Sequence, residues 1–176
     1  MSIEQHAYNL DYYKNFHKEN NIEGETGKTE EELEIISKDL ILYLKYGADN
    51  EVLDQHFNEK EVLHMVDVQN LFRLNRFLKY GGIGIYLVLL IFFHRRRDYI
   101  SIGRTFLFGP IINYTLFIFL GFLASTDFNK YFTFFHEIFF SNDLWLLDPN
   151  TDLMIQMLPE NFFMGMAKNI LLSYLL

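Results

Sequence analysis

The sequence predicts an all-α, polytopic integral membrane protein that carries a helical cap on its extracytoplasmic side. Half of the 176 residues are hydrophobic and 18% are aromatic, whereas the charged residues gather in separate blocks, as is typical of membrane proteins. Two segments, 77–93 and 106–124, approach the roughly 20 apolar residues that a spanning helix needs. Lys79 is the single charged residue of the first segment, and the second segment has none. We therefore expect at least two transmembrane helices.

Residues 1–76 precede the first span and form an acidic block, which we expect to be the extracytoplasmic helical cap. Thr29 and Glu32 have the spacing of a capping box, and apolar residues recur at helical spacing after them. This pattern predicts an amphipathic helix over 30–46 that ends at Gly47 and covers the membrane domain.

A second capping pattern, Asn58 followed by Glu61, predicts a helix that leads from the cap into the first span. The segments 20–29 and 48–57 lack helical periodicity and are expected to be loops. Residues 1–20 contain an aromatic cluster of the kind found at membrane interfaces.

Residues 77–124 are expected to hold two transmembrane helices that are joined by a basic loop at 94–104. Short loops rich in lysine and arginine remain in the cytoplasm. The basic residues of this loop are Arg95, Arg96, Arg97 and Arg104. The regions on either side of the two spans are therefore expected to be extracytoplasmic.

Residues 125–161 are expected to form an extracytoplasmic catalytic loop. This region contains an aromatic helix around His136, a turn at 148–150 and a short apolar helix that ends before Pro159. Residues 162–176 are apolar but too short for a full crossing, so we expect them to be the start of a last transmembrane helix.

Composition excludes several classes of function. The chain has no cysteine, so it has neither disulfides nor a thiol nucleophile, and no serine lies in a Gly-x-Ser-x-Gly elbow. Its acidic character argues against a nucleic-acid partner, because phosphate contacts require lysine and arginine. Membrane lipid or a lipid-bearing substrate is the expected ligand.

Two histidines are the candidate catalytic residues. Glu61, His64 and Asp67 are spaced three apart on one helix face, so a carboxylate can hold one imidazole nitrogen while the other faces a ligand. The alternative is an ordinary solvated helix face. His136 lies among aromatic residues near the membrane, where burial favours the neutral form that a general base needs. The alternative there is a histidine packed in an aromatic core.

A metal site is conceivable, because His64, Asp67, His136 and Glu137 are all acceptable ligands. The spacing of these residues is loose, however, and no His-Glu-x-x-His motif is present. We therefore expect neither a metal nor any other cofactor.

Two long motifs carry a family resemblance. The first is FNEKEVLHMVDV at 57–68, and the second comprises FHEIFF at 135–140, DPNTDL at 148–153 and LPE at 158–160. Together they resemble the lipoprotein intramolecular transacylase family, Lit, of Gram-positive bacteria, over nearly the whole chain. The resemblance implies four transmembrane helices, of which the first is absent and the last truncated in this sequence. It also implies an outer-face site with two essential histidines, here His64 and His136.

The resemblance further implies that the enzyme moves the sn-2 acyl chain of a diacylglyceryl lipoprotein to its N-terminal cysteine amine, giving a lyso-form lipoprotein. The implied partners are a diacylated bacterial lipoprotein and membrane lipid. The implied location is the bacterial cell membrane, crossed several times, with the active site outside. Residues that lie near the histidine motifs and are expected to support them are Glu61, Asp67, Glu137, Asp143 and Trp145.

Two rival functions remain open from the sequence. One is a metal-dependent membrane hydrolase that uses the same histidines. The other is a non-enzymatic membrane assembly or sensor subunit whose acidic cap binds a partner. The oligomeric state is open as well.

Overall fold

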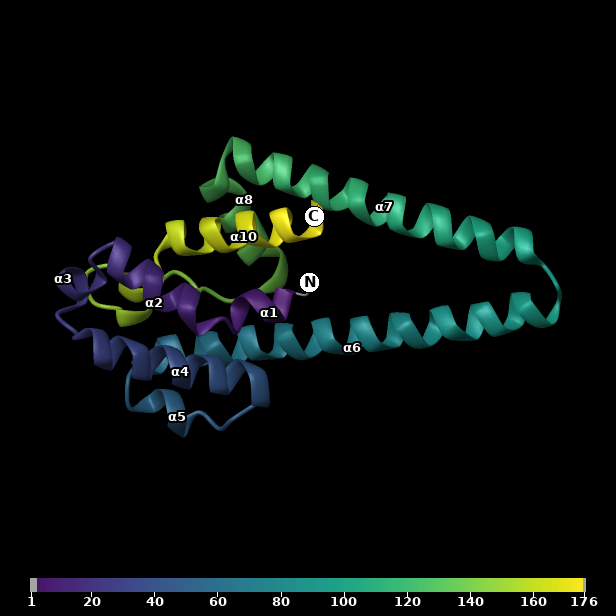
Figure 1. Cartoon of the computed structure of the whole chain (residues 1–176). Helices are drawn as coiled ribbons and strands as arrows, with labels where there is room; N and C mark the ends of the chain where they lie inside the picture. The colour runs from purple at the N-terminus through teal and green to yellow at the C-terminus, as the bar shows by residue number, and fades with distance from the viewer. Residues whose placement is uncertain (1–2, 176) are drawn as a thin grey trace.

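The fold was obtained as a computed structural model, which describes residues 3–175. Within that range all regular secondary structure is α-helical, which confirms the predicted fold class (Figure 1). The helices are α1 (Ile3–Ala7), α2 (Leu10–Glu19), α3 (Ile22–Thr26), α4 (Glu30–Tyr46), α5 (Glu51–Asp54), α6 (Glu59–Arg95), α7 (Tyr99–Thr126), α8 (Phe128–Phe139), α9 (Leu153–Met157) and α10 (Glu160–Leu175).

The helices α6 and α7 form a long antiparallel pair that extends well beyond the other elements (Figure 1). Both are long and apolar enough to cross a membrane, and no residue of their most apolar windows is buried, which suits contact with lipid. They are joined by a tight turn in which Arg97 adopts a φ of 56°. The Asp98 carboxylate accepts a hydrogen bond from the Ser101 backbone N–H and so caps α7.

Both predicted capping boxes are confirmed. The Thr29 hydroxyl accepts from the Glu32 N–H, and the Glu32 carboxylate accepts in return from the Thr29 N–H. The helix that begins there ends at Gly47, whose φ of 72° suits glycine. Asn58 and Glu61 form the same reciprocal pair at the start of α6, which then runs unbroken into the first span.

The core of the cap joins α2, α3 and α4 to the first turns of α6, to α9 and to the start of α10. Leu33, Ile36 and Leu40 line the inner face of α4 and are almost fully buried. Tyr13 and Phe16 of α2 pack their rings 4.8 and 5.1 Å from the ring of Phe162, between centroids. The interface role expected for the N-terminal aromatic residues is therefore wrong for Tyr13 and Phe16, which instead pack against a partner from the far end of the chain.

Two short helices occupy segments that the sequence predicted as loops. Ile22 begins α3 with 3% of its surface exposed, and Leu53 in α5 is completely buried. A single helical turn is too short to show a 3.6-residue period, so these apolar anchors give no pattern. The other local predictions are confirmed: the turn closes from the Thr151 N–H to the Asp148 carbonyl, and α9 ends before Pro159.

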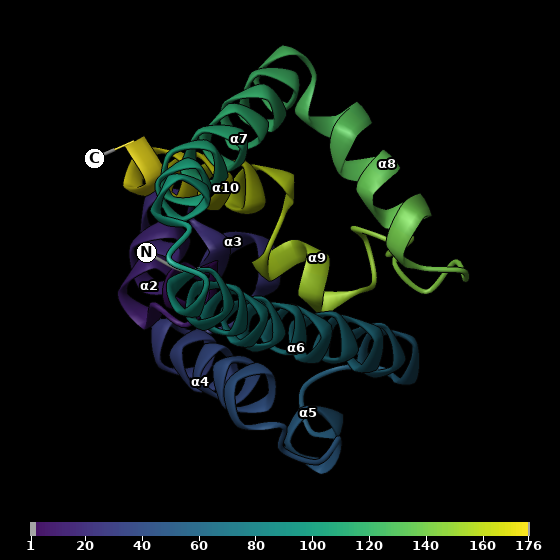
Figure 2. The same ribbon diagram turned by 90° about the vertical axis from the view of Figure 1, so that its right-hand side faces the viewer.

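The placement of α8 brings the second histidine motif back toward α6. The chain turns at Asp127, whose carboxylate accepts from the Lys130 N–H, and α8 then runs away from α7 toward the first turns of α6 (Figure 2). His136 is the buried residue of this helix, whereas Phe134 and Ile138 are exposed. The amphipathic character of α8 thus points His136 inward.

Candidate active site

His64 and His136 lie side by side, although they are far apart in the sequence. His64 is in the second turn of α6, in the part that precedes the apolar span, and His136 is in the last turn of α8. Their ring centroids are 6.1 Å apart, and each residue has 8% of its surface exposed. The structure therefore brings together the two histidines that the resemblance assigned to one site.

The orientation of His136 is set by its own helix. Its Nδ1 lies 2.7 Å from the carbonyl oxygen of Phe132, one turn earlier. A carbonyl only accepts hydrogen bonds, so Nδ1 carries the proton and Nε2 carries the lone pair in the neutral ring. Burial lowers the pKa of His136, against a smaller opposing effect of the Phe132 carbonyl, and keeps the ring neutral at pH 7. The rings of Phe132 and Trp145 lie 4.4 and 4.9 Å away.

His64 is the more strongly perturbed of the two histidines. Burial and, to a lesser degree, the neighbouring His136 lower the pKa of His64 to about 4, while Asp67 raises it slightly. His64 is therefore neutral at pH 7. Its Nδ1 is buried and has no hydrogen-bond partner among residues 3–175. The ring of Phe140 packs edge-on at 5.3 Å between centroids.

Glu61 does not hold the imidazole of His64, and that interpretation of the i, i+3 spacing is wrong. Its carboxylate, 1% exposed, accepts from the backbone N–H of Asn58 at 2.8 Å and of Met154 at 2.6 Å. Asn58 in turn donates from its side chain to Asp152. Glu61 thus ties the start of α6 to the start of α9, which the local spacing did not reveal.

The other proposed supporting residues separate into two groups. Trp145 packs against His136, and Asp67 accepts a hydrogen bond of 2.8 Å from the side chain of Asn142. Glu137 and Asp143 are exposed at the surface. The structure therefore brings Trp145 and Asp67, but not the two exposed carboxylates, into the neighbourhood of the histidine pair.

Sequence reasoning missed three groups at this site: the Phe132 carbonyl, the Phe140 ring and the Asn142 amide. The amide of Asn142 bonds to Asp67 across 75 positions of sequence, so no local pattern could have indicated the contact. Phe140 lay within the recognised motif, but nothing in that motif distinguishes it from its phenylalanine neighbours.

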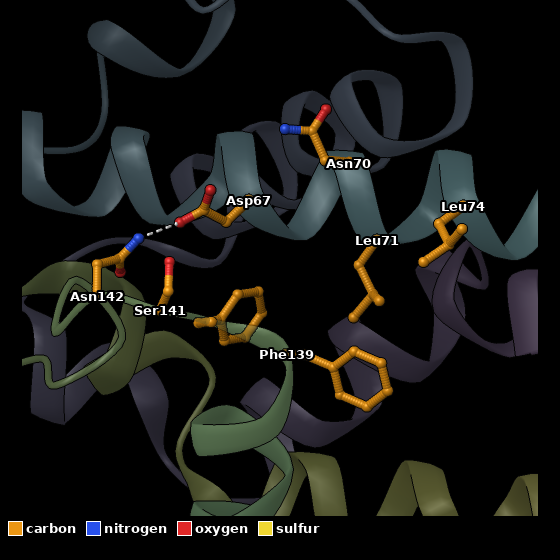
Figure 3. A pocket seen from close by; sticks show the side chains of 8 residues that line it. Asp67, Asn70, Leu71, Leu74, Phe139, Ser141 and Asn142 are labelled. Atoms are coloured by element: carbon orange, nitrogen blue, oxygen red, sulfur yellow. Dashed lines mark hydrogen bonds between the residues drawn. The ribbon is translucent and has the colours of Figure 1, made fainter.

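A groove of about 220 Å³ opens beside the histidine pair, between α6 and the end of α8 (Figure 3). Phe140 belongs to its wall and also contacts both imidazoles, with ring centroids 5.3 and 5.5 Å away. On α6, the residues His64, Asp67, Leu71 and Leu74 follow one another along a single face toward the span. The groove is lined by Asp67, Asn70, Leu71, Leu74, Phe139, Phe140, Ser141 and Asn142.

The site offers no obvious metal ligand set. In the part of the chain that the structure describes, no three His, Cys, Asp or Glu side chains form a group able to hold a metal ion. Of the four residues that the sequence suggested, Glu137 is exposed, and Asp67 accepts a hydrogen bond from Asn142 on one carboxylate oxygen. Within residues 3–175, no acidic or histidine side chain completes a ligand set with the two histidines.

The chain is similar to a known protein family and to solved structures. The profile of the family described as lipoprotein intramolecular transacylase Lit matches residues 1–163. A structure of the membrane-integral lipoprotein intramolecular transacylase Lit from Bacillus cereus is similar at 29% identity, with a TM-score of 0.84, over 98% of this chain and 80% of that chain. A variant of that enzyme with one histidine replaced by arginine is similar at 29% identity and a TM-score of 0.77, over 97% and 75% of the two chains.

A variant with alanine at that histidine is similar at 28% identity and a TM-score of 0.75, over 98% and 80% of the two chains. No curated protein sequence matches the chain. Because the family profile extends over most of its length, the chain belongs to the lipoprotein intramolecular transacylase family, Lit, and is a membrane acyltransferase.

Proposed function

We propose that this protein moves the sn-2 acyl chain of a diacylglyceryl-modified lipoprotein onto the α-amino group of the same lipid-bearing cysteine. The observation that carries the proposal is the pair of neutral, buried imidazoles 6.1 Å apart beside a groove that leads toward the spans. Ester aminolysis needs a base, a donor for the oxyanion and an acid for the leaving alcohol. Two histidines that are protonated on different ring nitrogens can supply the base, the oxyanion donor and the acid.

The reaction converts an ester into an amide within one substrate molecule. The substrate ammonium first loses a proton to solvent, and the amine nitrogen then attacks the carbonyl carbon of the sn-2 ester. As the C–N bond forms, the nitrogen gives a second proton to the base, and the carbonyl oxygen becomes an oxyanion. The adduct collapses by breaking the bond to the glyceryl oxygen, which takes up that second proton. The products are the N-acyl cysteine and a free glyceryl hydroxyl.

His136 is suited to be the base. The Phe132 carbonyl holds Nδ1–H, so Nε2 is the nitrogen that accepts the proton from the attacking amine. The same nitrogen then returns the proton to the glyceryl alkoxide. Because burial lowers the pKa of His136, its protonated form is a better proton donor than a free imidazolium, which favours that return.

His64 is suited to be the neutral donor. A buried N–H without a partner costs more than a buried lone pair, so the unpartnered Nδ1 of His64 favours the tautomer that is protonated on Nε2. A pKa of about 4 keeps this ring neutral throughout the reaction, so it donates a hydrogen bond to the oxyanion without giving up its proton.

The protein's other task is to bring the two reacting groups of the substrate together. Because the amine and the ester belong to one molecule, a correctly folded substrate gains up to about 7–11 kcal/mol from proximity alone. The acyl chain passes directly from oxygen to nitrogen, so the reaction needs no acyl-enzyme intermediate and no cofactor.

We place the site at the extracytoplasmic face of a multi-pass bacterial membrane protein. The basic turn between α6 and α7 lies at one end of the long pair, and the cap with the histidines lies at the other end (Figure 1). Lysine- and arginine-rich turns remain in the cytoplasm, which supports an outer location for the cap. Diacylated lipoproteins present their lipid-bearing cysteine at that surface.

The test is the mass spectrum of a lipoprotein co-expressed with the wild-type protein or with His64→Ala or His136→Ala. We expect the lyso-form with the wild-type protein, and a loss of about 10²–10⁴ in rate for each variant. His94→Ala, at the exposed far end of α6, is the matched control and should retain full activity. Full activity in either site variant, at equal protein levels in the membrane, would overturn the assignment.

A further inference from the structure

Asp67 is the carboxylate that lines the groove, and it has no positive partner among the described residues. Among residues 3–175, the ion pairs join Glu4, Glu32, Glu34 and Asp39 to basic side chains, but none involves Asp67. Its neighbour His64, one turn earlier on α6, is neutral at pH 7 because burial lowers its pKa to about 4. Asp67 therefore brings an uncompensated negative charge to the groove wall.

The position of this carboxylate is held by a neutral amide. Asn142 donates from Nδ2 to one oxygen of Asp67 at 2.8 Å (Figure 3). Its own Oδ1 accepts from the Leu144 N–H at 3.1 Å. An ionised carboxylate offers about four acceptor positions, so the contact with Asn142 leaves room for further donors. The hydrogen bond fixes the carboxylate in the groove wall without neutralising it.

The remainder of the groove is apolar on the side toward the membrane. Leu71 and Leu74 continue the α6 face beyond Asp67, and Phe139 faces them from α8 (Figure 3). Leu74 lies three residues before the apolar span begins. At about 220 Å³ the groove is smaller than the roughly 300–1,000 Å³ of pockets that enclose a whole small ligand. It fits one end of an amphiphile whose remainder lies in lipid.

We propose that this groove binds the lipid-bearing cysteine of the substrate, with Asp67 receiving the α-ammonium group and the Leu71, Leu74 and Phe139 surface receiving the first methylenes of an acyl chain. The inference rests on the proposed function and specifies how that substrate is recognised. Asp67 is a positioning residue here: it holds the amine within one helical turn of His64, about 4.5 Å along the axis, before the amine loses its proton.

The test uses two probes that the enzyme cannot turn over. One is a dialkyl ether analogue of the diacylglyceryl-cysteine peptide with a free α-amine, and the other is the same molecule acetylated on that amine. Binding of both is measured on the full chain in detergent micelles. The wild-type protein should bind the free-amine probe about tenfold more tightly, as expected for one charge-assisted hydrogen bond in a partly buried site.

The informative variant is Asp67→Asn, which retains an oxygen for Asn142 but removes the charge. It should bring the two affinities within about twofold of each other by weakening the free-amine probe alone. Asp143→Asn, which removes an exposed carboxylate that does not line the groove, is the control and should retain the tenfold preference. In turnover, Asp67→Asn should raise KM more than it lowers kcat.

Two results would overturn the inference. A preference for the free-amine probe that persists in Asp67→Asn would mean that another group of the protein binds the ammonium. An equal loss of both probes would mean that Asp67 only supports the fold. The two proposals fail independently, because they are measured in different assays. The mass spectrum of the lipoprotein tests the transacylase function, and the binding of the two probes tests the role of Asp67.

Discussion

Glu61 offers the sharpest separation between a catalytic and an architectural role. Replacing it with alanine leaves the backbone N–H groups of Asn58 and Met154 without their acceptor. Hydrogen bonds to a charged acceptor contribute about 1.5–3 kcal/mol each, so about 3–6 kcal/mol is lost. Removing a buried carboxylate offsets part of this loss, because burial raises the pKa of Glu61 despite the N–H donors of Met154 and Asn58.

The net destabilisation of Glu61→Ala should therefore be about 3 kcal/mol, which corresponds to a fall of about 6–12 °C in Tm for a chain of this size. Glu61→Gln retains one acceptor oxygen and should lose about half as much. Thermal unfolding in detergent, followed by the fluorescence of Trp145, measures both variants. Glu59→Ala, an exposed position in the same helical turn, should leave Tm unchanged.

Activity measured on the same samples decides the role of Glu61. We expect Glu61→Ala to lose transacylation in parallel with Tm, and to regain it at temperatures well below the new Tm. A variant that unfolds like the wild-type protein but makes no lyso-form lipoprotein would refute the architectural role. It would return Glu61 to the chemistry of the histidine pair.

Three further predictions follow from the same geometry. Because the folded pKa of His64 is lowered to about 4, the unfolded chain binds one more proton than the folded chain between pH 4 and 6.5. The free energy of unfolding should therefore fall by up to about 3 kcal/mol as the pH drops through that window. His64→Gln should flatten the dependence of Tm on pH. Single cysteines at the exposed positions Glu31 and Asn150 should react with a membrane-impermeant thiol reagent on intact cells, and one at Ile100 should not. The opposite labelling pattern would move the site to the cytoplasm. Acid-quenched enzyme should carry no acyl group, and a stoichiometric acyl adduct would establish a ping-pong route. Chelators should leave turnover intact, and loss of turnover that zinc restores would favour the metal-dependent alternative.

The local structure of this protein follows from rules that act within one or two helical turns. The capping boxes at Thr29 and Asn58 predicted the starts of α4 and α6, because each box is complete within four residues. The apolar stretches at 77–93 and 106–124 predicted the two long helices, because a membrane span is a property of a continuous segment. The two histidines were identified as candidates by the residues immediately around them.

The relations between distant segments required the tertiary structure. The 6.1 Å approach of His64 to His136, the bond from Met154 to Glu61 and the bond from Asn142 to Asp67 each join different elements. Neither helical period nor capping pattern carries information across such separations, because these contacts depend on how whole helices pack. The sequence by itself thus determined the two capped helices, the spans and the candidate histidines, but not the short helices α3 and α5. Packing alone decided that Glu61 supports the fold and that Asp67 faces the groove.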